Sequence, residues 1–276
     1  MILNEFYKLS NGFSIPKLAF GTWQITNDAV VEAAKTALNI GYRHIDTAAA
    51  YENETGVGEA MKRSELCRED IFITTKIPAE VKTYESAKAV IEASLNNLDT
   101  PYIDLMLIHS PKPWPELFAG SEKTYYEENL SVWKAMEEAV KAGKIRSIGV
   151  SNFEISDIKN ILEHAEIKPA VNQIRVHIGH TPTEVIEFCR EHDILIMAFS
   201  PNATGKLLGH PVISEVATKY GVSVPQLSIR YDLQLGLLPL PRSINPEHIK
   251  ENTELAFSID ETDMNKLGMI EEIQSL

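Results

Sequence analysis

The sequence predicts an α/β fold in which about eight parallel strands alternate with helices and close into a barrel. Short apolar runs rich in β-branched residues recur along the chain, and amphipathic segments separate them. Successive runs start 23 to 43 residues apart, which leaves room for a strand, a helix and two loops. After about sixteen leading residues, the remainder divides into eight units of about 32 residues. An open doubly wound sheet would show the same alternation, so periodicity favours the barrel without excluding that alternative.

The first sixteen residues predict a β-hairpin that precedes the repeating units. Residues 6–9 and 13–15 are short alternating segments, and Asn11-Gly12 lies between them. Asn-Gly favours the tight turn that joins two antiparallel strands. We therefore expect a separate two-stranded element at the start of the chain.

Seven apolar runs predict buried parallel strands. They cover residues 43–46, 71–76, 103–109, 145–152, 170–173, 194–200 and 237–243. Each run is closed by polar residues, as expected where a buried strand reaches the edge of a sheet. These polar ends are the positions at which a parallel barrel carries its chemistry.

Apolar side chains spaced three and four residues apart predict helices between the strands. Residues 83–98 show this spacing, and residues 130–140 repeat it, with Gly143 as the expected stop. Thr181 is the expected N-cap of a further helix from 182 to about 192, with Glu184 as its reciprocal partner. Gly56-Val57-Gly58 begins like a dinucleotide-binding fingerprint but lacks the third glycine, so we interpret it as a closely packed helix.

Composition excludes several classes of function. The chain has 276 residues, with 26 Lys plus Arg against 39 Asp plus Glu. This acidic balance disfavours nucleic acid and membrane surfaces as partners, so a phosphate ligand needs a locally basic pocket. Cys67 and Cys189 are too few for a disulfide framework, and we expect neither a secretory signal nor a membrane span. We expect one cytoplasmic domain over residues 1–276, a monomer or weak homo-oligomer.

Ionisable residues close three consecutive strands. Asp46 ends the run at 43–46, Lys76 ends the next and His109 ends the third, while Tyr51 follows Asp46 by five residues. If consecutive strands are neighbours, these side chains meet at one rim of the barrel. A single such residue would more often be a solvated loop residue, but four at equivalent positions favour an active site.

This set is suited to proton donation to a carbonyl oxygen, with Tyr51 as the acid. A free tyrosine has a pKa of about 10, and a cation about 4 Å away provides roughly the 3 to 4 kcal/mol that lowers it by two or three units. We expect Lys76 to be that cation and Asp46 to keep it protonated. His109 would orient the substrate carbonyl.

Long motifs in the same regions resemble those of the aldo-keto reductases. The matching residues are 21–23, 41–48 with Tyr51, Asn53 and Glu54, 141–153, 171–173, 241–243 and 251–252. The resemblance implies a (β/α)8 TIM barrel with an N-terminal β-hairpin plugging its base. It also implies an enzyme that transfers a hydride from a nicotinamide cofactor to aldehydes and ketones, giving alcohols without a metal. The implied catalytic tetrad is Asp46, Tyr51, Lys76 and His109.

The family's cofactor contacts carry over to twelve positions. By resemblance, the nicotinamide end takes Ser151, Asn152, Gln173 and Phe199. The pyrophosphate would meet Ser200, Asn202 and Lys206. The adenosine 2'-phosphate would meet Arg242, Ser243 and His248, and adenine would meet Glu251 and Asn252.

The 2'-phosphate positions depart from the family pattern. Arg242 stands where the family usually has lysine and keeps a forked cationic grip, whereas His248 stands where it usually has arginine. A histidine carries a full charge only at acidic pH, so about one charge is lost. We expect NADPH as cofactor, with substantial tolerance of NADH.

Trp23 and Trp114 are the expected substrate contacts. The family usually has tryptophan directly after the catalytic histidine, where this chain has Ser110, so we expect a wider pocket. Small aldehydes, 2-oxo-aldehydes, keto sugars and activated ketones are plausible substrates. His177 and His180 are interpreted as loop residues rather than metal ligands, because no further ligand completes a set.

Two alternatives from other classes stay open. A barrel of this family can act as a cofactor-sensing regulatory subunit with little turnover. A barrel lyase that uses Lys76 as a Schiff-base amine is the second alternative.

Overall fold

Eight parallel strands form the central sheet of the computed structural model, which describes residues 1–273. They are β3 (Phe20–Gly21), β4 (His44–Asp46), β5 (Phe72–Ile77), β6 (Ile103–Ile108), β7 (Ile145–Ser151), β8 (Val171–Arg175), β9 (Leu195–Phe199) and β10 (Leu238–Leu240). Each strand pairs in parallel with the next one in the chain. The outer strands also meet, since Gly21 N donates to Pro241 O at 3.0 Å and Ala19 N donates to Pro239 O at 3.3 Å. The predicted barrel is confirmed, and the open sheet is excluded.

The predicted strands lie where the structure has strands, but several predicted lengths differ from the observed ones. The last expected run, 237–243, contains only the three residues of β10, because Pro241 has no N–H with which to extend the ladder. β5 and β8 instead continue beyond their expected ends, to Ile77 and Arg175. β3 has only two residues, which is too short to produce a recognisable apolar run.

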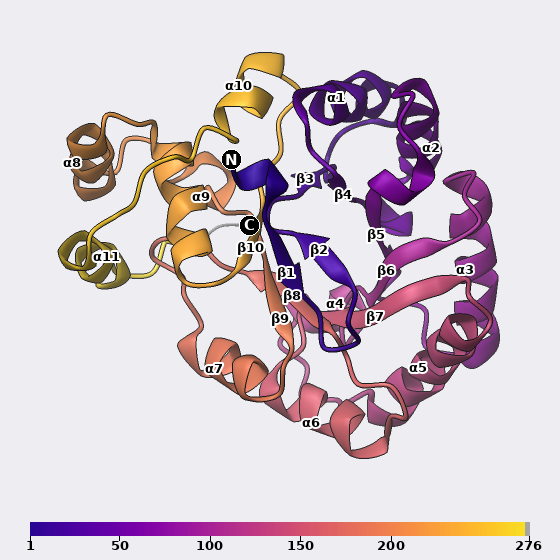
Figure 1. Ribbon diagram of the computed structural model, residues 1–276. Helices are drawn as coiled ribbons and strands as arrows, with labels where there is room; N and C mark the ends of the chain where they lie inside the picture. Colours follow the sequence, from indigo (N-terminus) through magenta and orange to yellow (C-terminus); the bar gives the residue numbers. More distant parts are fainter. Residues whose placement is uncertain (274–276) are drawn as a thin grey trace.

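Helices surround the barrel (Figure 1). They are α1 (Asn27–Ile40), α2 (Glu54–Arg63), α3 (Tyr84–Asn97), α4 (Trp114–Phe118), α5 (Tyr126–Lys141), α6 (Ile155–His164), α7 (Thr183–Glu191), α8 (Pro211–Tyr220), α9 (Val224–Gln234), α10 (Pro246–Glu251) and α11 (Glu261–Gly268). Short 3-10 turns cover Ile2–Asn4, Ala49–Tyr51, Arg68–Asp70 and Ala203–Gly205. Within residues 1–273, none of these helices has the length and apolar character needed to cross a membrane.

Local capping explains two helix boundaries and fails for a third. The Thr83 hydroxyl accepts from Ser86 N at the start of α3, and Gly143 follows α5 with a φ of +74°. The expected Thr181 N-cap is wrong, because α7 starts after Pro182 without a side-chain cap. The Thr181 hydroxyl instead lies 3.2 Å from the Tyr231 hydroxyl, so a tertiary contact replaces the cap.

The predicted hairpin, β1 (Phe6–Lys8) with β2 (Ser14–Pro16), lies across the end of the barrel nearest the viewer in Figure 1. Its buried Leu9 and Ile15 pack with inward-facing barrel side chains such as Leu105. The Tyr7 hydroxyl donates to Leu237 O at 3.1 Å, just before β10 begins. The hairpin therefore plugs the base, and the opposite end stays available for a site.

The two glycines of α2 have a packing role. A side chain at Gly58 would bring its Cβ within 2.7 Å of Leu98 O, and one at Gly56 would overlap Asn27 O and Val30. Only glycine permits these close approaches to the helix's neighbours. The interpretation of this segment as a closely packed helix is confirmed.

Candidate active site

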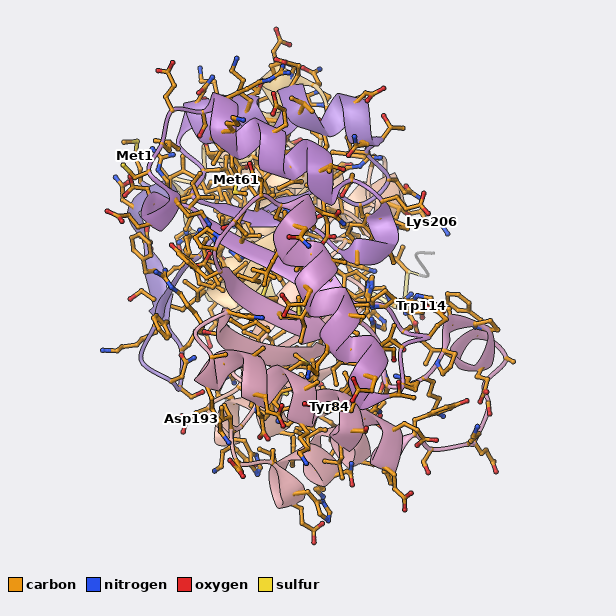
Figure 2. The ribbon with its side chains drawn as sticks, turned by 90° about the vertical axis from the view of Figure 1, so that its right-hand side faces the viewer. Met1, Met61, Tyr84, Trp114, Asp193 and Lys206 are labelled. Carbon is orange, nitrogen blue, oxygen red and sulfur yellow. The ribbon has the colours of Figure 1, made fainter. Side chains whose placement is uncertain are left out.

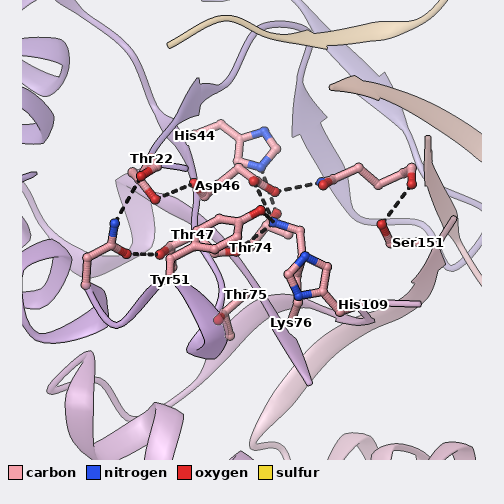
Figure 3. A network of polar contacts seen from close by, with 12 residues as sticks. Thr22, His44, Asp46, Thr47, Tyr51, Thr74, Thr75, Lys76, His109 and Ser151 are labelled. Carbon is pink, nitrogen blue, oxygen red and sulfur yellow. Dashed lines mark hydrogen bonds and ion pairs between the residues drawn. The ribbon is translucent and has the colours of Figure 1, made fainter. Parts of the chain in front are cut away.

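The four predicted catalytic side chains meet at the end of the barrel opposite the hairpin (Figure 3). Lys76 Nζ lies 2.7 Å from Asp46 Oδ1 and 3.4 Å from the Tyr51 hydroxyl oxygen. The Tyr51 and His109 rings meet edge to face, with centroids 5.5 Å apart. Lys76 is completely buried, and Asp46 and His109 are also buried.

Strand register explains this convergence. Asp46, the last residue of β4, is paired with Thr74 of β5, so Lys76 lies two residues further on and points to the same side of the strand. The next strand, β6, ends at Ile108, and His109 follows it directly. Tyr51 returns to the rim on the turn Ala49–Tyr51. The sequence order of these residues thus becomes a spatial cluster because neighbouring strands are parallel.

The environment of Lys76 keeps it charged. Burial alone would lower the pKa of this amine, but the Asp46 carboxylate and Tyr51 together raise it above the ordinary value. Nζ also donates to Thr47 O at 2.8 Å. Lys76 is therefore an ammonium ion whose position is set by Asp46, as predicted.

The expected direction of the pKa shift of Tyr51 is wrong. Burial raises the pKa of this phenol above 10, and the Asp46 charge adds to that increase, while Lys76 opposes it. The expectation counted only the lysine, whereas desolvation is the larger effect and Asp46 balances much of the lysine charge. Tyr51 consequently holds its proton at neutral pH, which is the state that a proton donor needs.

His109 is neutral at the same pH. Burial, followed by the Lys76 charge, holds the pKa of its imidazole well below 6.5. Its buried Nδ1 has no hydrogen-bond partner among residues 1–273. Buried polar atoms are normally satisfied, so His109 has a hydrogen-bonding capacity that the described residues do not use.

Three residues predicted to contact nicotinamide lie directly against the tetrad. Gln173 Nε2 donates to Asp46 Oδ2 at 2.7 Å, and the Ser151 hydroxyl donates to Gln173 O at 2.9 Å. Asn152 Nδ2 donates to His109 O at 3.0 Å. Asn152 has a φ of 59°, a left-handed conformation that asparagine tolerates better than most residues. The structure therefore joins the predicted cofactor and catalytic sets into one network.

Sequence reasoning missed the residues that support the rim. Asn53 Nδ2 donates to Thr22 O at 3.0 Å and to Ile25 O at 2.9 Å, and its Oδ1 accepts from the Thr47 hydroxyl at 2.7 Å. Thr22 also donates through its hydroxyl to Asp46 O. The position of Asn53 two residues after Tyr51 within a long motif was the available signal.

The loop after β9 carries the residues expected at the pyrophosphate. Phe199 ends β9 and is partly exposed, and the following Ser200 has a φ of 54°. Asn202 Oδ1 is buried and lacks a partner among the described residues, whereas Lys206 is exposed. Figure 2 shows Lys206 on the same side of the molecule as Trp114. Lys206, as an exposed cation on this loop, fits the expected contact with a pyrophosphate.

The residues expected at the adenosine end follow β10. Arg242 is exposed, and its guanidinium bonds to the backbone after β3, with Nε 3.1 Å from Trp23 O and Nη2 3.2 Å from Gln24 O. Ser243 is partly exposed and accepts from Asn245 N at 3.0 Å. The other three are His248 and Glu251 on α10, both exposed, and the buried Asn252 just after it.

An aromatic wall extends outward from His109. The Trp114 ring meets the His109 ring edge to face at 5.1 Å, and Phe118 stacks on Trp114 at 5.8 Å. Phe118 is 81% exposed, and Trp23 is 41% exposed. Trp114 thus lies beside His109, the predicted catalytic histidine. The family that the sequence resembles usually has tryptophan directly after this histidine, where this chain has Ser110.

His177 and His180 pair with each other across an isolated β-bridge. His180 Nδ1 also lies 3.4 Å from the Glu272 carboxylate. No group of three or more His, Cys, Asp or Glu residues within 1–273 is arranged to hold a metal ion.

Comparison with known proteins identifies the family. The model of the aldo/keto reductase family matches residues 17–272. The chain belongs to the aldo/keto reductase family. A glyoxal reductase of Bacillus subtilis is 40% identical over 270 residues, covering 97% of this chain and 93% of the relative. An aldehyde reductase of Saccharomyces cerevisiae is 37% identical over 285 residues, covering 96% and 90%.

Solved aldo/keto reductases share the whole fold. An enzyme of this family from Brucella melitensis superposes with a TM-score of 0.89 at 37% identity, covering 97% of this chain and 98% of the other. An aldo-keto reductase from Bombyx mori, solved with NADP, gives a TM-score of 0.85 at 31% identity, covering 96% and 92%. The predicted family and barrel are confirmed, and membership supports carbonyl reduction as the activity of this enzyme.

Proposed function

We propose that this protein is an NAD(P)H-dependent reductase that converts aldehydes and ketones to alcohols, with Tyr51 as the general acid. The observation that carries the proposal is the buried ion pair of Lys76 and Asp46 beside a phenol that holds its proton. The proposal also takes residues 1–276 as one catalytic domain.

The chain's residues divide between holding the cofactor and moving a proton. A bound dihydronicotinamide supplies the hydride that reaches the carbonyl carbon. Ser151, Asn152 and Gln173 would hold its carboxamide, and Phe199 would stack on its ring. Since Gln173 bonds to Asp46 and Asn152 bonds to the backbone of His109, a ring held there would lie next to the tetrad.

Tyr51 donates its proton to the carbonyl oxygen as that oxygen gains negative charge. Lys76 stabilises the phenolate that remains, because its ammonium lies 3.4 Å from the phenol oxygen and is held by Asp46. The neutral His109 donates a ring N–H to the same carbonyl and sets its orientation. One proton and one hydride are consumed for each alcohol formed.

The substrates that we propose are small aldehydes, 2-oxo-aldehydes, keto sugars and activated ketones. Trp23 and Trp114 would line their binding site, since the Trp114 ring contacts His109 and the exposed Trp23 directly follows Thr22, whose hydroxyl bonds to Asp46 O. The similarity to a glyoxal reductase supports the 2-oxo-aldehyde class first.

The test is the loss of NADPH absorbance on addition of methylglyoxal. Tyr51→Phe should lower kcat by about 10²- to 10⁴-fold, the usual contribution of a positioned acid. Tyr7→Phe removes a phenol at the base of the barrel and serves as the matched control, which should keep its activity. Full activity in Tyr51→Phe would overturn the assignment of the acid.

We propose NADPH as the preferred cofactor, with substantial use of NADH. The support is His248, an exposed histidine at a position where the family usually has arginine. NADPH and NADH should differ by less than about a hundredfold in kcat/KM, where each 1.4 kcal/mol corresponds to tenfold. His248→Arg should widen this difference, because arginine restores the positive charge that histidine lacks near neutral pH. A larger difference in the wild type would contradict this proposal.

The two alternatives make different predictions. A Schiff-base lyase needs a neutral amine, whereas Asp46 keeps Lys76 protonated, so borohydride with substrate should not label Lys76. A cofactor-sensing subunit would bind NADPH without consuming it on addition of a reactive aldehyde. Steady turnover therefore separates the enzyme from the sensor.

A further inference from the structure

Arg242 connects two parts of the site that have different tasks. It follows β10, where the adenosine 2'-phosphate is expected, but its guanidinium donates to Trp23 O at 3.1 Å and to Gln24 O at 3.2 Å. Those two carbonyls belong to the turn after β3 that carries the expected substrate contact, Trp23. A single side chain thus reaches from the cofactor end of the site to its substrate end.

The turn at Trp23 and Gln24 depends on side-chain support. Gln24 has a φ of 57°, a left-handed conformation that is strained for a residue other than glycine, asparagine or aspartate. Asn53 holds the turn from the catalytic side through Thr22 O and Ile25 O. Arg242 holds it through Trp23 O and Gln24 O. Loss of either support would let the turn relax.

A phosphate would compete with the turn for Arg242. The guanidinium uses Nε and Nη2 toward the two carbonyls, and a forked pair of this kind is what binds a phosphate in bidentate fashion. A charged phosphate is a stronger acceptor than a neutral backbone carbonyl. A phosphate bound through Nε and Nη2 would therefore displace the two carbonyls, whereas one bound through the remaining Nη1 and Nη2 hydrogens would leave the turn in place. The exchange experiment below distinguishes these two modes.

We propose that Arg242 is a specificity-determining residue that couples the cofactor to the substrate turn. It braces Trp23 and Gln24 when the cofactor lacks a 2'-phosphate, and it leaves the turn to bind a 2'-phosphate when one is present. This inference rests on the proposed nicotinamide cofactor. Its consequence is that the KM for one carbonyl substrate is higher with NADPH than with NADH, by roughly threefold to tenfold, the weight of a net hydrogen bond.

The decisive experiment uses hydrogen exchange and needs no turnover. 2'-AMP carries the phosphate in question, and 5'-AMP is its matched control. At saturation, 2'-AMP should speed exchange of the amides at Thr22–Ile25 by roughly threefold to tenfold relative to 5'-AMP, the same hydrogen-bond weight. Calorimetric titration of each nucleotide establishes that the site is filled.

Substitutions of Arg242 separate the effect of its positive charge from the effect of its hydrogen bonds to the turn. In Arg242→Met, the amides at Thr22–Ile25 should exchange fast even without a nucleotide, and the variant should bind 2'-AMP more weakly. Arg242→Lys should recover much of the 2'-AMP affinity but still show the fast exchange, because lysine lacks the fork. Arg190→Met is the control: Arg190 is also exposed and donates to a backbone carbonyl, Leu235 O, yet it lies on α7.

Equal exchange with the two nucleotides, at saturation, would overturn the coupling, and so would 2'-AMP binding that is absent or independent of Arg242. These outcomes are distinct from failure of the proposed function, which is measured separately as turnover of methylglyoxal by the wild type.

Discussion

Two buried carboxylates, Asp104 and Asp46, lie at opposite ends of the barrel. Both form ion pairs, but the surroundings of the two pairs differ. At the base, Asp104 Oδ2 accepts from Arg68 Nη2 at 2.7 Å and from Ile73 N at 3.0 Å, and Oδ1 accepts from Arg146 Nη1 at 3.0 Å. The Tyr102 ring lies between the two guanidiniums, 4.1 and 3.8 Å from their central carbons. Every charged group there is bonded to the protein itself.

At the opposite end, Asp46 is bonded to Lys76 and Gln173, each at 2.7 Å. Here the neighbours keep unused capacity: Tyr51 holds a transferable proton, and His109 Nδ1 lacks a partner within residues 1–273. The comparison shows that a buried ion pair alone does not mark an active site. An unsatisfied group alone does not mark one either, since the buried Tyr102 hydroxyl at the base also lacks a partner within residues 1–273. The difference is that Asp46 and Lys76 lie beside a phenol that holds its proton and a neutral imidazole.

The positions of residues with left-handed backbone conformation also differ between the two ends of the barrel. Left-handed residues at the base, such as Asp99 and Asp193, follow helices, where such a residue commonly ends the helix. At the opposite end, Asn152 and Ser200 are left-handed directly after strands, and the former is held by its bond to His109 O. Conformational strain is therefore concentrated where ligands are expected to bind.

The largest expected effect comes from removing both charges of the catalytic pair. The double variant Asp46→Asn with Lys76→Met should lower kcat by about 10³-fold, because the phenolate loses its stabilising cation. Removing both partners leaves no isolated buried charge, so the unfolding free energy should change by less than about 2 kcal/mol. Steady-state kinetics and urea unfolding measure the two quantities, and retained activity would contradict the role of the pair.

Asp104→Asn should give the opposite result at the base. The two guanidiniums would lose their shared carboxylate, and the unfolding free energy should fall by about 3 kcal/mol. The kcat/KM should stay within about twofold of the wild type, since the base only supports the barrel. A loss of activity comparable to that of the first variant would remove the distinction between the two ends.

His44 lies on β4 between the two ends, and it predicts a dependence of stability on pH. Burial, with the Lys76 charge adding to it, lowers the pKa of this imidazole to about 3. The folded state therefore stays neutral, while the unfolded state takes up a proton below about pH 6.5. Stability is complete above pH 6.5 and is lost as the pH falls toward 3, by about 2 kcal/mol at pH 5.

Replacement of His44 tests how much of the acid-induced loss of unfolding free energy this side chain causes. His44→Gln should reduce the difference in unfolding free energy between pH 7 and pH 5, as measured by urea titration. Identical differences in the variant and the wild type would show that other groups cause the acid sensitivity.

The smallest expected effect is at the tip of the hairpin. Gly12 has a φ of +90° and open space around it, so Gly12→Ala should cost about 1 kcal/mol through backbone conformation alone. Thermal unfolding should show a small decrease in Tm, with kcat unchanged. A change in kcat would mean that the plug communicates with the site at the other end.

Much of the site was predictable because parallel strands place successive strand ends at one rim. Asp46 ends β4, Lys76 is the penultimate residue of β5 and His109 directly follows β6, so their convergence required only the barrel. The pKa of Tyr51 was not predictable from its neighbours in the chain. It depends on how much water the folded rim excludes, and burial outweighs the lysine.

Arg242 and Thr181 illustrate the same limit. The family resemblance predicts a phosphate contact for Arg242, which stays a prediction, and the local sequence predicts a helix cap at Thr181, which is wrong. Neither indicated the contacts that folding forms with Trp23 O and with the Tyr231 hydroxyl. These partners are more than forty residues away in sequence. A short polar motif cannot indicate which distant acceptor will lie within hydrogen-bond reach.

The sequence by itself determined the repeating units, the hairpin and the identity of the four residues at the rim, because these follow from local periodicity and from strand order. The tertiary structure decided the protonation of Tyr51, the unsatisfied nitrogen of His109 and the partners of Arg242. Desolvation and hydrogen bonding depend on distances between segments that are far apart in the chain, and those distances exist only once the barrel has closed.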